Sequence, residues 1–289
     1  MVTATDSFVE HRNLLFTVAY EMLGSAADAE DVLQETWLRW SEVDQSEVRD
    51  ERAYLVRITT RLALNRMRTL ARRRESYVGP WLPEPLLTSP DVAEDVELAD
   101  SVSTAMLVVL ETLAPTERAV FVLREVFDLG YDEIAAAVDK STVAVRQIAS
   151  RARDHVAERR PRGGVTPTQR DEVIARFLGA TASGDLQSLM DVLAPDVVLL
   201  TDGGGVKKAA LRPILGREKV VRFLEAVAPE GVEADVVVVN GAPALRLLID
   251  GEVDGIGTML VEDGMVTGLY IVRNPAKLSR LDDVVALTR

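Results

Sequence analysis

The stretch GYDEIAAAVDKSTVAVRQIASRARDHV, residues 130–156, carries the strongest structural signal in this 289-residue chain. Gly130 precedes a short run that favours a helix, DKS predicts a tight turn, and a longer basic helix is expected from Thr142. A short helix, a tight turn and a basic helix are typical of a helix-turn-helix. The pattern predicts a DNA-binding module, and a purely structural three-helix unit is the alternative.

The second of these helices places polar side chains at its outward positions. Arginine and glutamine make paired hydrogen bonds to guanine and adenine in the major groove, and serine can contact a phosphate or a base. The candidate DNA-reading residues are Arg146, Gln147, Ser150, Arg151 and Arg153. We expect four apolar residues to face inward, namely Val143, Val145, Ile148 and Ala149.

Upstream, residues 50–74 predict a long helix that is almost purely basic. Residues 49–74 hold nine arginines against Asp50 and Glu51. A solvated helix face usually mixes charges, whereas arginine alone attracts phosphate. Asn65 lies among the arginines and can donate and accept toward a base edge. The packed side is expected to hold Ala53, Val56, Thr60, Ala63 and Met67.

Residues 6–42 predict two helices, and the second begins with the acidic stretch DAEDVLQETWLRW, residues 28–40. Acids near a helix N-terminus are favourable, which explains some of these side chains. It does not explain the expected exposure of Gln34 and Trp37. An acidic surface that also offers aromatic side chains fits the docking of a basic protein helix.

The segment RRRESYVGPWLPEPLL, residues 72–87, leads into a linker over residues 76–98. Pro80, Pro83 and Pro85 exclude a helix interior or a central strand, because proline fixes φ and lacks a backbone donor. A bare spacer would have no need of Tyr77 and Trp81. We expect helices to resume near Leu98.

The periodicity changes after residue 165. Residues 168–193 and 216–227 predict helices, and residues 234–275 predict strands. Asn240-Gly241, Asp250-Gly251 and Asp263-Gly264 are strong signals for two-residue hairpins. The C-terminal region is therefore expected to be an α+β domain in which helices pack on a curved, four-stranded antiparallel meander.

Bulk composition sets limits on the class of protein. The net charge of −13 argues against nucleic acid, but charge alternates in blocks. Residues 1–48 hold two basic and ten acidic side chains, before the arginine-rich helix, and residues 81–111 hold seven acids and no base. Blocks of this kind indicate surfaces with different partners. The absence of cysteine, of an apolar span and of a signal-like start predicts a cytoplasmic protein that contacts no membrane. No constellation predicts a metal or cofactor.

Taken in order, DAEDVLQETWLRW, the basic helix, and LAPTERAVFVLREVFDLGYDEIAAAVDKSTVAVRQIASRAR (residues 113–153) resemble the two domains of a bacterial extracytoplasmic-function (ECF) sigma factor. The resemblance covers nearly all of residues 6–160. YVGPWLPEPL and the C-terminal region are similar to the subgroup, called the sigma-J type, with a SnoaL-like extension. The resemblance implies two all-α domains, the second with the helix-turn-helix, and a C-terminal α+β cone-shaped domain. The expected segments are 1–75, the linker 76–98, 99–162, and 165–289.

The resemblance also implies partners and roles. The acidic helix would dock on the clamp helices of the β′ subunit of core RNA polymerase through Asp28, Asp31, Gln34, Glu35 and Trp37. The basic helix would hold and open the −10 promoter element through Arg57, Arg61, Asn65, Arg66 and Arg68. The helix-turn-helix residues already named would read the −35 element. Capturing an unstacked base requires a polar pocket beside a positive groove.

For the C-terminal domain, the resemblance implies regulation in cis. The subgroup carries an Asp-Gly-Gly-Gly-Lys motif where this chain has Asp202 to Val206, so a role that needs lysine at position 206 is in doubt. The alternatives are a loose loop for the glycines and an ordinary strand end for NPAKL, residues 274–278. We expect the linker tryptophan to dock near the glycine loop. The candidate interdomain residues are Trp81, Pro83, Asp202, Gly203, Gly204, Gly205, Asn274, Pro275 and Lys277.

Catalysis is the less favoured reading of this domain. Acid–base chemistry in such a cone needs a carboxylate or histidine in an apolar pocket, and His11 and His155 both lie outside the domain. Asp202, Asp235, Asp250 and Asp254 remain as candidates. Two rival functions stay open: a helix-turn-helix repressor, and a regulator fused to a small-molecule-binding or isomerase- or cyclase-like domain. The expected function is that of a sigma factor and not of an enzyme.

Overall fold

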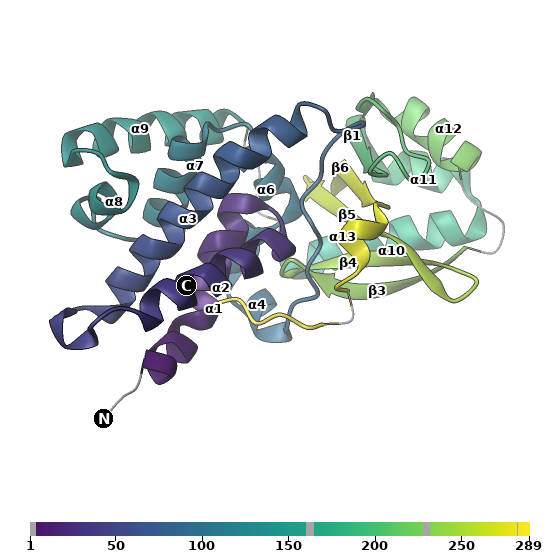
Figure 1. Cartoon of the computed structure of the whole chain (residues 1–289). Coiled ribbons are helices and arrows are strands. Elements are labelled where there is room, and N and C mark those ends of the chain that lie inside the picture. Colours follow the sequence, from purple (N-terminus) through teal and green to yellow (C-terminus); the bar gives the residue numbers. More distant parts are fainter. Residues whose placement is uncertain (1–3, 160–164, 228–231, 282) are drawn as a thin grey trace.

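The computed structural model describes residues 4–159, 165–227, 232–281 and 283–289. A body of helices lies beside a mixed α+β domain, and the linker passes between them (Figure 1). This is the predicted fold class. Of the predicted domain boundaries, residue 162 lies outside the described residues.

The first domain consists of α1 (Ala4–Leu23), α2 (Ala26–Ser41), the short 3₁₀ turn η1 (Gln45–Glu47) and α3 (Glu51–Arg74). Gly24 adopts a φ of +65° between α1 and α2, which favours glycine. Ser25 then caps α2 by accepting a hydrogen bond from the Asp28 amide. The sequence predicted all three long helices closely.

The second domain contains α4 (Pro90–Glu94), α5 (Val96–Val102), α6 (Thr104–Leu110), α7 (Pro115–Phe121), the π-helical turn η2 (Val122–Val126), α8 (Tyr131–Val138) and α9 (Thr142–Arg159). Helices resume at Pro90 and not near Leu98, because Ser89 and Pro90 form a helix start with proline in the first turn. The helix-turn-helix, α8 and α9, is confirmed.

The C-terminal domain, called the cone domain below, contains α10 (Pro167–Ser183), α11 (Leu186–Val192), β1 (Leu193–Asp202), β2 (Ile214–Leu215), α12 (Arg217–Val227), β3 (Glu233–Val239), β4 (Ala242–Ile249), β5 (Glu252–Glu262), β6 (Met265–Val272) and α13 (Pro275–Leu278). Residues 168–193, expected to be helical, form two helices with a break at Gly184 and Asp185. Gly184 ends α10 in the left-handed conformation, and Asp185 caps α11.

The sheet order is β2-β1-β6-β5-β4-β3. The predicted antiparallel meander is confirmed as β3 to β6, and its three turns have positive φ at both central residues. The predicted meander did not include the other two strands of the sheet. These are β1, which pairs parallel to β6, and the short β2, which pairs antiparallel to β1. Helix α6 of the second domain contacts β5 and β6, so the sheet is used within the chain.

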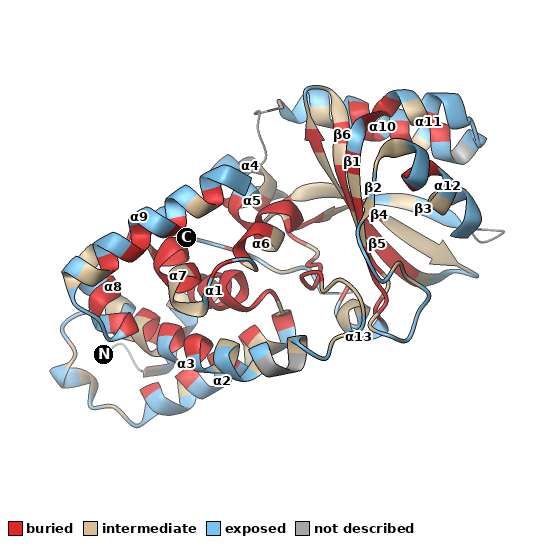
Figure 2. Ribbon diagram, turned by 90° about the horizontal axis from the view of Figure 1, so that it is seen from above, coloured by how far each residue is buried: buried red, intermediate tan, exposed pale blue. Residues whose placement is uncertain are grey.

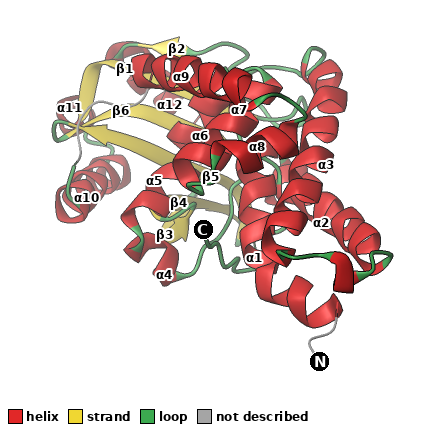
Figure 3. Ribbon diagram, turned by 90° about the vertical axis from the view of Figure 1, so that its left-hand side faces the viewer, coloured by secondary structure: helices red, strands yellow, loops and turns green. Residues whose placement is uncertain are grey.

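Two extended segments tie the bodies together. In the linker, Leu87 forms an antiparallel bridge with Val239 at the end of β3. The C-terminal strap, residues 283–289, pairs with Thr88 through Val285 and inserts Leu287 into the helical core. Figures 1 and 3 both place the C-terminus beside α1, where the Thr288 amide donates to the Thr17 hydroxyl at 3.1 Å. Figure 2 shows buried residues where the helical body meets the sheet.

None of the helices in the described part of the chain is long and apolar enough to cross a membrane.

Candidate functional site

The acidic face of α2 lies on the molecular surface. Asp31, Gln34 and Glu35 are exposed, Asp28 is half-buried, and Trp37 is half-buried against Phe8 with ring centroids 5.3 Å apart. Because Ser25 and the buried carboxylate of Glu84 fix the start of α2, these side chains have defined directions. The candidate docking residues therefore occupy one rigid helix.

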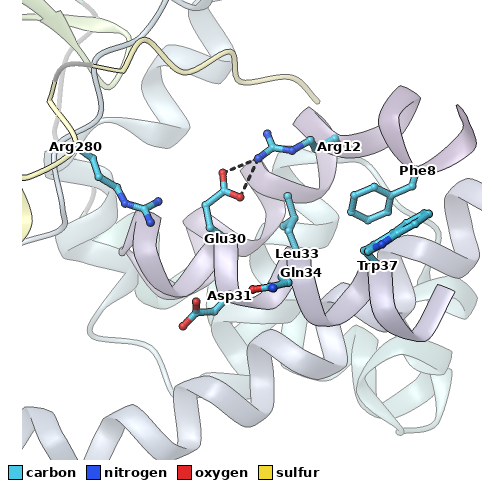
Figure 4. A pocket seen from close by; sticks show the side chains of 8 residues that line it. All are labelled: Phe8, Arg12, Glu30, Asp31, Leu33, Gln34, Trp37 and Arg280. Carbon is cyan, nitrogen blue, oxygen red and sulfur yellow. Dashed lines mark hydrogen bonds and ion pairs between the residues drawn. The ribbon is translucent and has the colours of Figure 1, made fainter. Parts of the chain in front are cut away.

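A groove of about 380 Å³ runs along this face between α1 and α2. Figure 4 shows Phe8 and Trp37 at one end of it and Arg280 of the cone domain at the other. Arg12 donates to both carboxylate oxygens of Glu30 at 2.8 Å. The groove has an apolar end, a carboxylate wall and a basic end, which suits a helix of mixed charge. Its lining residues are Phe8, Arg12, Glu30, Asp31, Leu33, Gln34, Trp37 and Arg280.

Arg66 connects the acidic helix to the basic one. It forms ion pairs with Asp28 at 2.6 Å and Asp31 at 2.9 Å. These contacts raise the pKa of Arg66, chiefly through the hydrogen bond to Asp28. The sequence assigned Arg66 to DNA and the two acids to a protein partner, whereas the structure brings all three side chains together.

The other basic residues of α3 are spread along its length. Arg57 lies over the Tyr54 ring at 4.7 Å, and the exposed Asn65 accepts from Arg68. Val56, Thr60 and Ala63 are buried as expected, but Leu55, Thr59, Leu62 and Leu64 are buried too. The reason is that α3 packs on α1 and α2 on one side and on α7 and α8 on another.

Arg61 joins the first domain to the helix-turn-helix. Its guanidinium donates to the Ala136 carbonyl oxygen at 2.8 Å and to the Ala137 carbonyl oxygen at 3.4 Å. These carbonyl groups lie at the C-terminal end of α8, where the helix dipole favours a cation. Arg61, which was predicted to bind DNA, thus donates its hydrogen bonds to the backbone of α8 in this structure.

A second pocket, of about 360 Å³, lies where the loop before α3 meets α8. Its polar lining, with one aromatic ring and Arg57, resembles the pocket expected beside the positive groove. The sequence did not predict that the loop before α3 lines a pocket. The charged pair Arg49 and Asp50, a few residues before Tyr54, is the local signal that could have indicated it. The pocket is lined by Glu47, Val48, Arg49, Asp50, Ala53, Tyr54, Arg57, Glu133 and Ala136.

Helix α9 presents its candidate DNA-reading residues to solvent. Arg146, Gln147, Ser150, Arg151 and Arg153 are all exposed, while Val145, Ile148 and Ala149 are buried. The inward placement of Val143 was wrong, since its side chain is 65% exposed. Position 143 precedes 146, 147 and 150 by three, four and seven residues, so Val143 lies on the same face as these candidate residues.

Buried charges join the two helical domains to each other. Arg118 is 1% exposed, donates to the Glu21 carbonyl oxygen at 2.8 Å and pairs with Glu111, which also pairs with Arg74. The Ser101 hydroxyl donates to Glu21 at 2.8 Å, but the second carboxylate oxygen of Glu21 has no partner. Burial raises the pKa of Glu21 to about 8.

Asp202, at the end of β1, fastens the linker to the cone domain and is fully buried. It accepts hydrogen bonds from the Tyr77 hydroxyl at 2.6 Å, the Leu82 amide at 2.9 Å and the Lys277 ammonium at 2.7 Å. Lys277 also donates to the Leu82 carbonyl oxygen. We call these four residues the linker lock. Burial lowers the pKa of Lys277 to about 8.

Trp81 lies between two cations above the α1–α2 turn. The Arg74 guanidinium and the Lys277 ammonium each lie 3.9 Å from its ring. A side chain on Gly24 would come within 2.7 Å of the indole, so glycine is required there by space as well as by conformation. The nearby linker residues Pro83 and Pro85 are buried.

The glycine loop packs closely against its neighbours. A Cβ on Gly203 would lie 2.2 Å from the Lys207 carbonyl oxygen, and one on Gly204 would lie 2.4 Å from Asn274. Gly205 has a φ of +73° and faces Val78 of the linker. Asn274 caps α13 and donates to Tyr77 at 2.8 Å, while Pro275 is the exposed first residue of that helix.

Val206 and the following lysine show what replaces the family motif. Val206 is 75% exposed, and Lys207 pairs with Asp254 at 2.9 Å. Position 206 therefore makes no charged contact, and the neighbouring Lys207 is held by a carboxylate of β5.

Asn240 is a contact residue that the sequence reading treated only as a turn residue. Its amide donates to Tyr20 of α1 at 2.6 Å and to the Val102 carbonyl oxygen at 2.8 Å, and its oxygen accepts from the Leu86 amide at 3.0 Å. Gly241 beside it approaches Ala99 so closely that a Cβ would lie 2.8 Å away. The Asn-Gly pair thus serves both the hairpin and the junction of all three domains.

Three of the four carboxylates considered for catalysis have other partners, and the fourth, Asp250, is exposed. Asp202 belongs to the linker lock, and Asp250 is exposed in a turn with a φ of +53°. A hydrogen bond from Arg246 lowers the pKa of Asp235. Burial acts to raise the pKa of Asp254, but Lys207 and Arg273 together hold it below its ordinary value. An acid–base catalyst at neutral pH needs a shift in the opposite direction.

Comparison with known proteins identifies the family. Residues 8–73 match Sigma-70 region 2, and residues 103–156 match Sigma-70 region 4. The chain is 37% identical over 284 residues to the ECF RNA polymerase sigma factor SigJ of Mycobacterium tuberculosis (strain ATCC 25618 / H37Rv), covering 93% of this chain and 91% of SigJ. It is 32% identical over 275 residues to the probable ECF RNA polymerase sigma factor SigI of the same species (strain CDC 1551 / Oshkosh), covering 94% and 93%.

The crystal structure of M. tuberculosis SigJ matches this structure with a TM-score of 0.78 at 34% identity, covering 96% of this chain and 99% of SigJ. The chain belongs to the ECF sigma factors, which are transcription initiation factors and not enzymes. The resemblance to a sigma factor of the sigma-J type is confirmed, and promoter-directed transcription is its function.

Proposed function

We propose that this sigma factor keeps its two promoter-reading domains packed together while it is free, and that docking on core RNA polymerase separates them. The observation that carries the proposal is the contact of Arg61 with α8. Arg61 is expected to contact the −10 element, and α8 belongs to the helix-turn-helix that is expected to bind the −35 element. While Arg61 donates to α8, it is not available to DNA.

The pocket beside Arg57 supports the same proposal. Tyr54 and Arg57 suit the capture of an unstacked base, because an aromatic ring offers stacking and a guanidinium offers charge. Glu133 and Ala136 of α8 form part of its wall, so an acidic side chain stands where DNA would enter. Moving α8 away would open the pocket and remove that negative charge.

The cone domain would hold the packed arrangement through the linker. The linker lock and Asn240 attach the same short segment to the cone domain, and Asn240 also reaches both helical domains. Regulation in cis would then act on the distance between the two promoter-reading domains. The linker between them sets the effective concentration of one domain at its promoter element once the other has bound. Such a factor would work in the cytoplasm, with polymerase and promoter DNA.

The remaining residue roles follow from position and charge. Asp28, Asp31, Gln34, Glu35 and Trp37 would dock on the β′ clamp helices of polymerase. The exposed face of α9 would read the −35 element, and Val143 would add an apolar contact to a thymine methyl group.

Distance measurements between two dyes test the separation. The chain has no cysteine, so cysteines introduced at the exposed positions Ala71 in α3 and Glu158 in α9 can be labelled alone. We expect high energy transfer in the free protein and a clear decrease when core polymerase is added. A pair within the cone domain, at Gln187 and Glu252, should not change. Equal transfer with and without polymerase would contradict the proposal.

A further inference from the structure

Arg280 brings the cone domain to the groove on α2. Its side chain is exposed and lines the end of the groove nearest the start of α2, across from Glu30 (Figure 4). Within the described part of the chain, no side-chain ion pair or hydrogen bond of the guanidinium is found, and its charge acts at longer range on the buried Glu84. The guanidinium of Arg280 can therefore donate hydrogen bonds to a molecule that binds in the groove.

The backbone of Arg280 is fixed from both sides. The next residue, Leu281, is buried in the sheet-side core, and Lys277, three residues earlier, is held by Asp202. Arg280 therefore belongs to the same short segment as the linker lock.

The charges of the groove define what it can receive. Arg12 is already paired with Glu30, while Asp31 remains 63% exposed beside Arg66. Among the lining residues, Arg280 is therefore the cation that offers its full hydrogen-bonding capacity. An occupant would place an apolar side chain against Phe8 and Trp37, a basic one beside Asp31, and an acidic one at Arg280.

We propose that Arg280 is a polymerase-contacting residue of the cone domain, and that it binds an acidic side chain on the core-polymerase helix that enters this groove. The proposal rests on the proposed docking of α2 and adds the cone domain to that interface. A guanidinium and a carboxylate form paired, charge-assisted hydrogen bonds, which suit a rim contact that guides docking.

This contact would also link docking to the linker. Arg280 lies three residues after Lys277, so a displacement of Arg280 on polymerase binding would also move Lys277 and change the contacts of the linker lock.

Binding of purified core polymerase to the full-length chain tests the proposal. We expect Arg280→Glu to weaken binding about tenfold, Arg280→Ala to weaken it about threefold, and Arg280→Lys to retain most of the affinity, with the differences shrinking as salt rises. Arg222→Ala, an exposed arginine of α12, is the matched control and should bind like the wild type. Thermal unfolding of all four variants is measured beside binding; because both side chains are exposed and Arg280 acts on Glu84 only at longer range, the changes should be small.

The outcomes separate this proposal from the proposed function. If the wild-type chain fails to bind core polymerase, the docking of α2 itself is wrong. If the wild type binds and the Arg280 variants bind equally or more tightly, the role of Arg280 is overturned and the docking of α2 stands.

Discussion

The side-chain amide of Asn240 donates a 2.6 Å hydrogen bond to the hydroxyl of Tyr20, 220 positions earlier in the chain. The same amide reaches the end of α5, and the side-chain oxygen receives the linker amide of Leu86. One hairpin turn therefore contacts both helical domains and the linker at a site closed to water.

Replacing Asn240 should destabilise the whole chain. Asn240→Ala leaves buried polar groups without partners and forces alanine into a positive φ, which together cost about 2–4 kcal/mol. Asn240→Gly keeps the turn and should lose only the hydrogen-bond part. Urea unfolding measures both, and Asp250→Ala, at the equivalent but exposed turn position, should show the strain alone. Equal effects of Asn240→Ala and Asp250→Ala would mean that the interdomain contacts contribute nothing.

Glu21 should make stability depend on pH. Its folded pKa of about 8 lies above the ordinary value of 4.5, so the folded protein holds a proton that the unfolded chain releases. Stability from this group is complete below pH 4.5 and is lost as pH rises toward 8. We expect the free energy of unfolding to fall by about 2.5 kcal/mol from pH 5.5 to 7.5, because the slope stays somewhat below about 1.4 kcal/mol per pH unit.

Glu21→Gln should remove that slope, because an amide does not titrate. Glu10→Gln, an exposed acid on the same helix, should leave the slope unchanged. Urea unfolding at several pH values decides between them, and a wild-type slope in Glu21→Gln would show that another group is responsible.

Val143 should recognise a thymine methyl group in the −35 element. Burying one methyl group is worth about 0.8 kcal/mol, so replacing the contacted thymine by uracil should weaken wild-type binding by about fourfold. Val143→Ala should bind the two DNAs almost equally, because the methyl group has lost its partner. Arg146→Ala should cost more, about 1–3 kcal/mol.

The measurement is promoter binding by the chain together with core polymerase, with uracil placed at one thymine at a time. If the wild type ignores every such substitution, Val143 does not face a thymine.

The linker lock should be sensitive to the loss of one charge. Asp202→Asn leaves the Lys277 ammonium buried without a counter-charge, and breaking a buried pair in this way costs about 3–5 kcal/mol. We expect faster proteolysis within the linker and altered promoter output. Adding Lys277→Met to Asp202→Asn should restore part of the stability, since no buried charge remains.

The control is the more exposed ion pair of Asp235 with Arg246, where Asp235→Asn should cost less than about 1 kcal/mol. Linker cleavage at the wild-type rate in Asp202→Asn would show that the lock does not hold the linker.

Local signals explain what could be predicted from the sequence. The Asn-Gly and Asp-Gly turns, the prolines at helix starts and the spacing around DKS each depend on neighbouring residues, and the hairpins and the helix-turn-helix follow from them. Contacts between distant segments leave no such pattern. The parallel pairing of β1 with β6, the cap that Glu84 places on α2, and the role of Asn240 were therefore missed.

The predictions of which apolar residues are buried were incomplete for α3 and wrong for Val143 of α9. The periodicity of α3 indicates apolar positions but cannot say that two different sets of helices cover them. Val143 is apolar and follows helical spacing, yet it faces solvent, so apolar character alone did not identify the packed side of α9.

The C-terminal strap has a consequence for how this protein unfolds. Leu287 fills a place in the core shared with α1, and the Thr288 amide donates to the Thr17 hydroxyl, so the segment after the cone domain completes the packing of a helix far away in the sequence. Detaching the strap would therefore expose part of the helical core. The helical body and the cone domain are expected to lose their structure in one cooperative transition rather than separately.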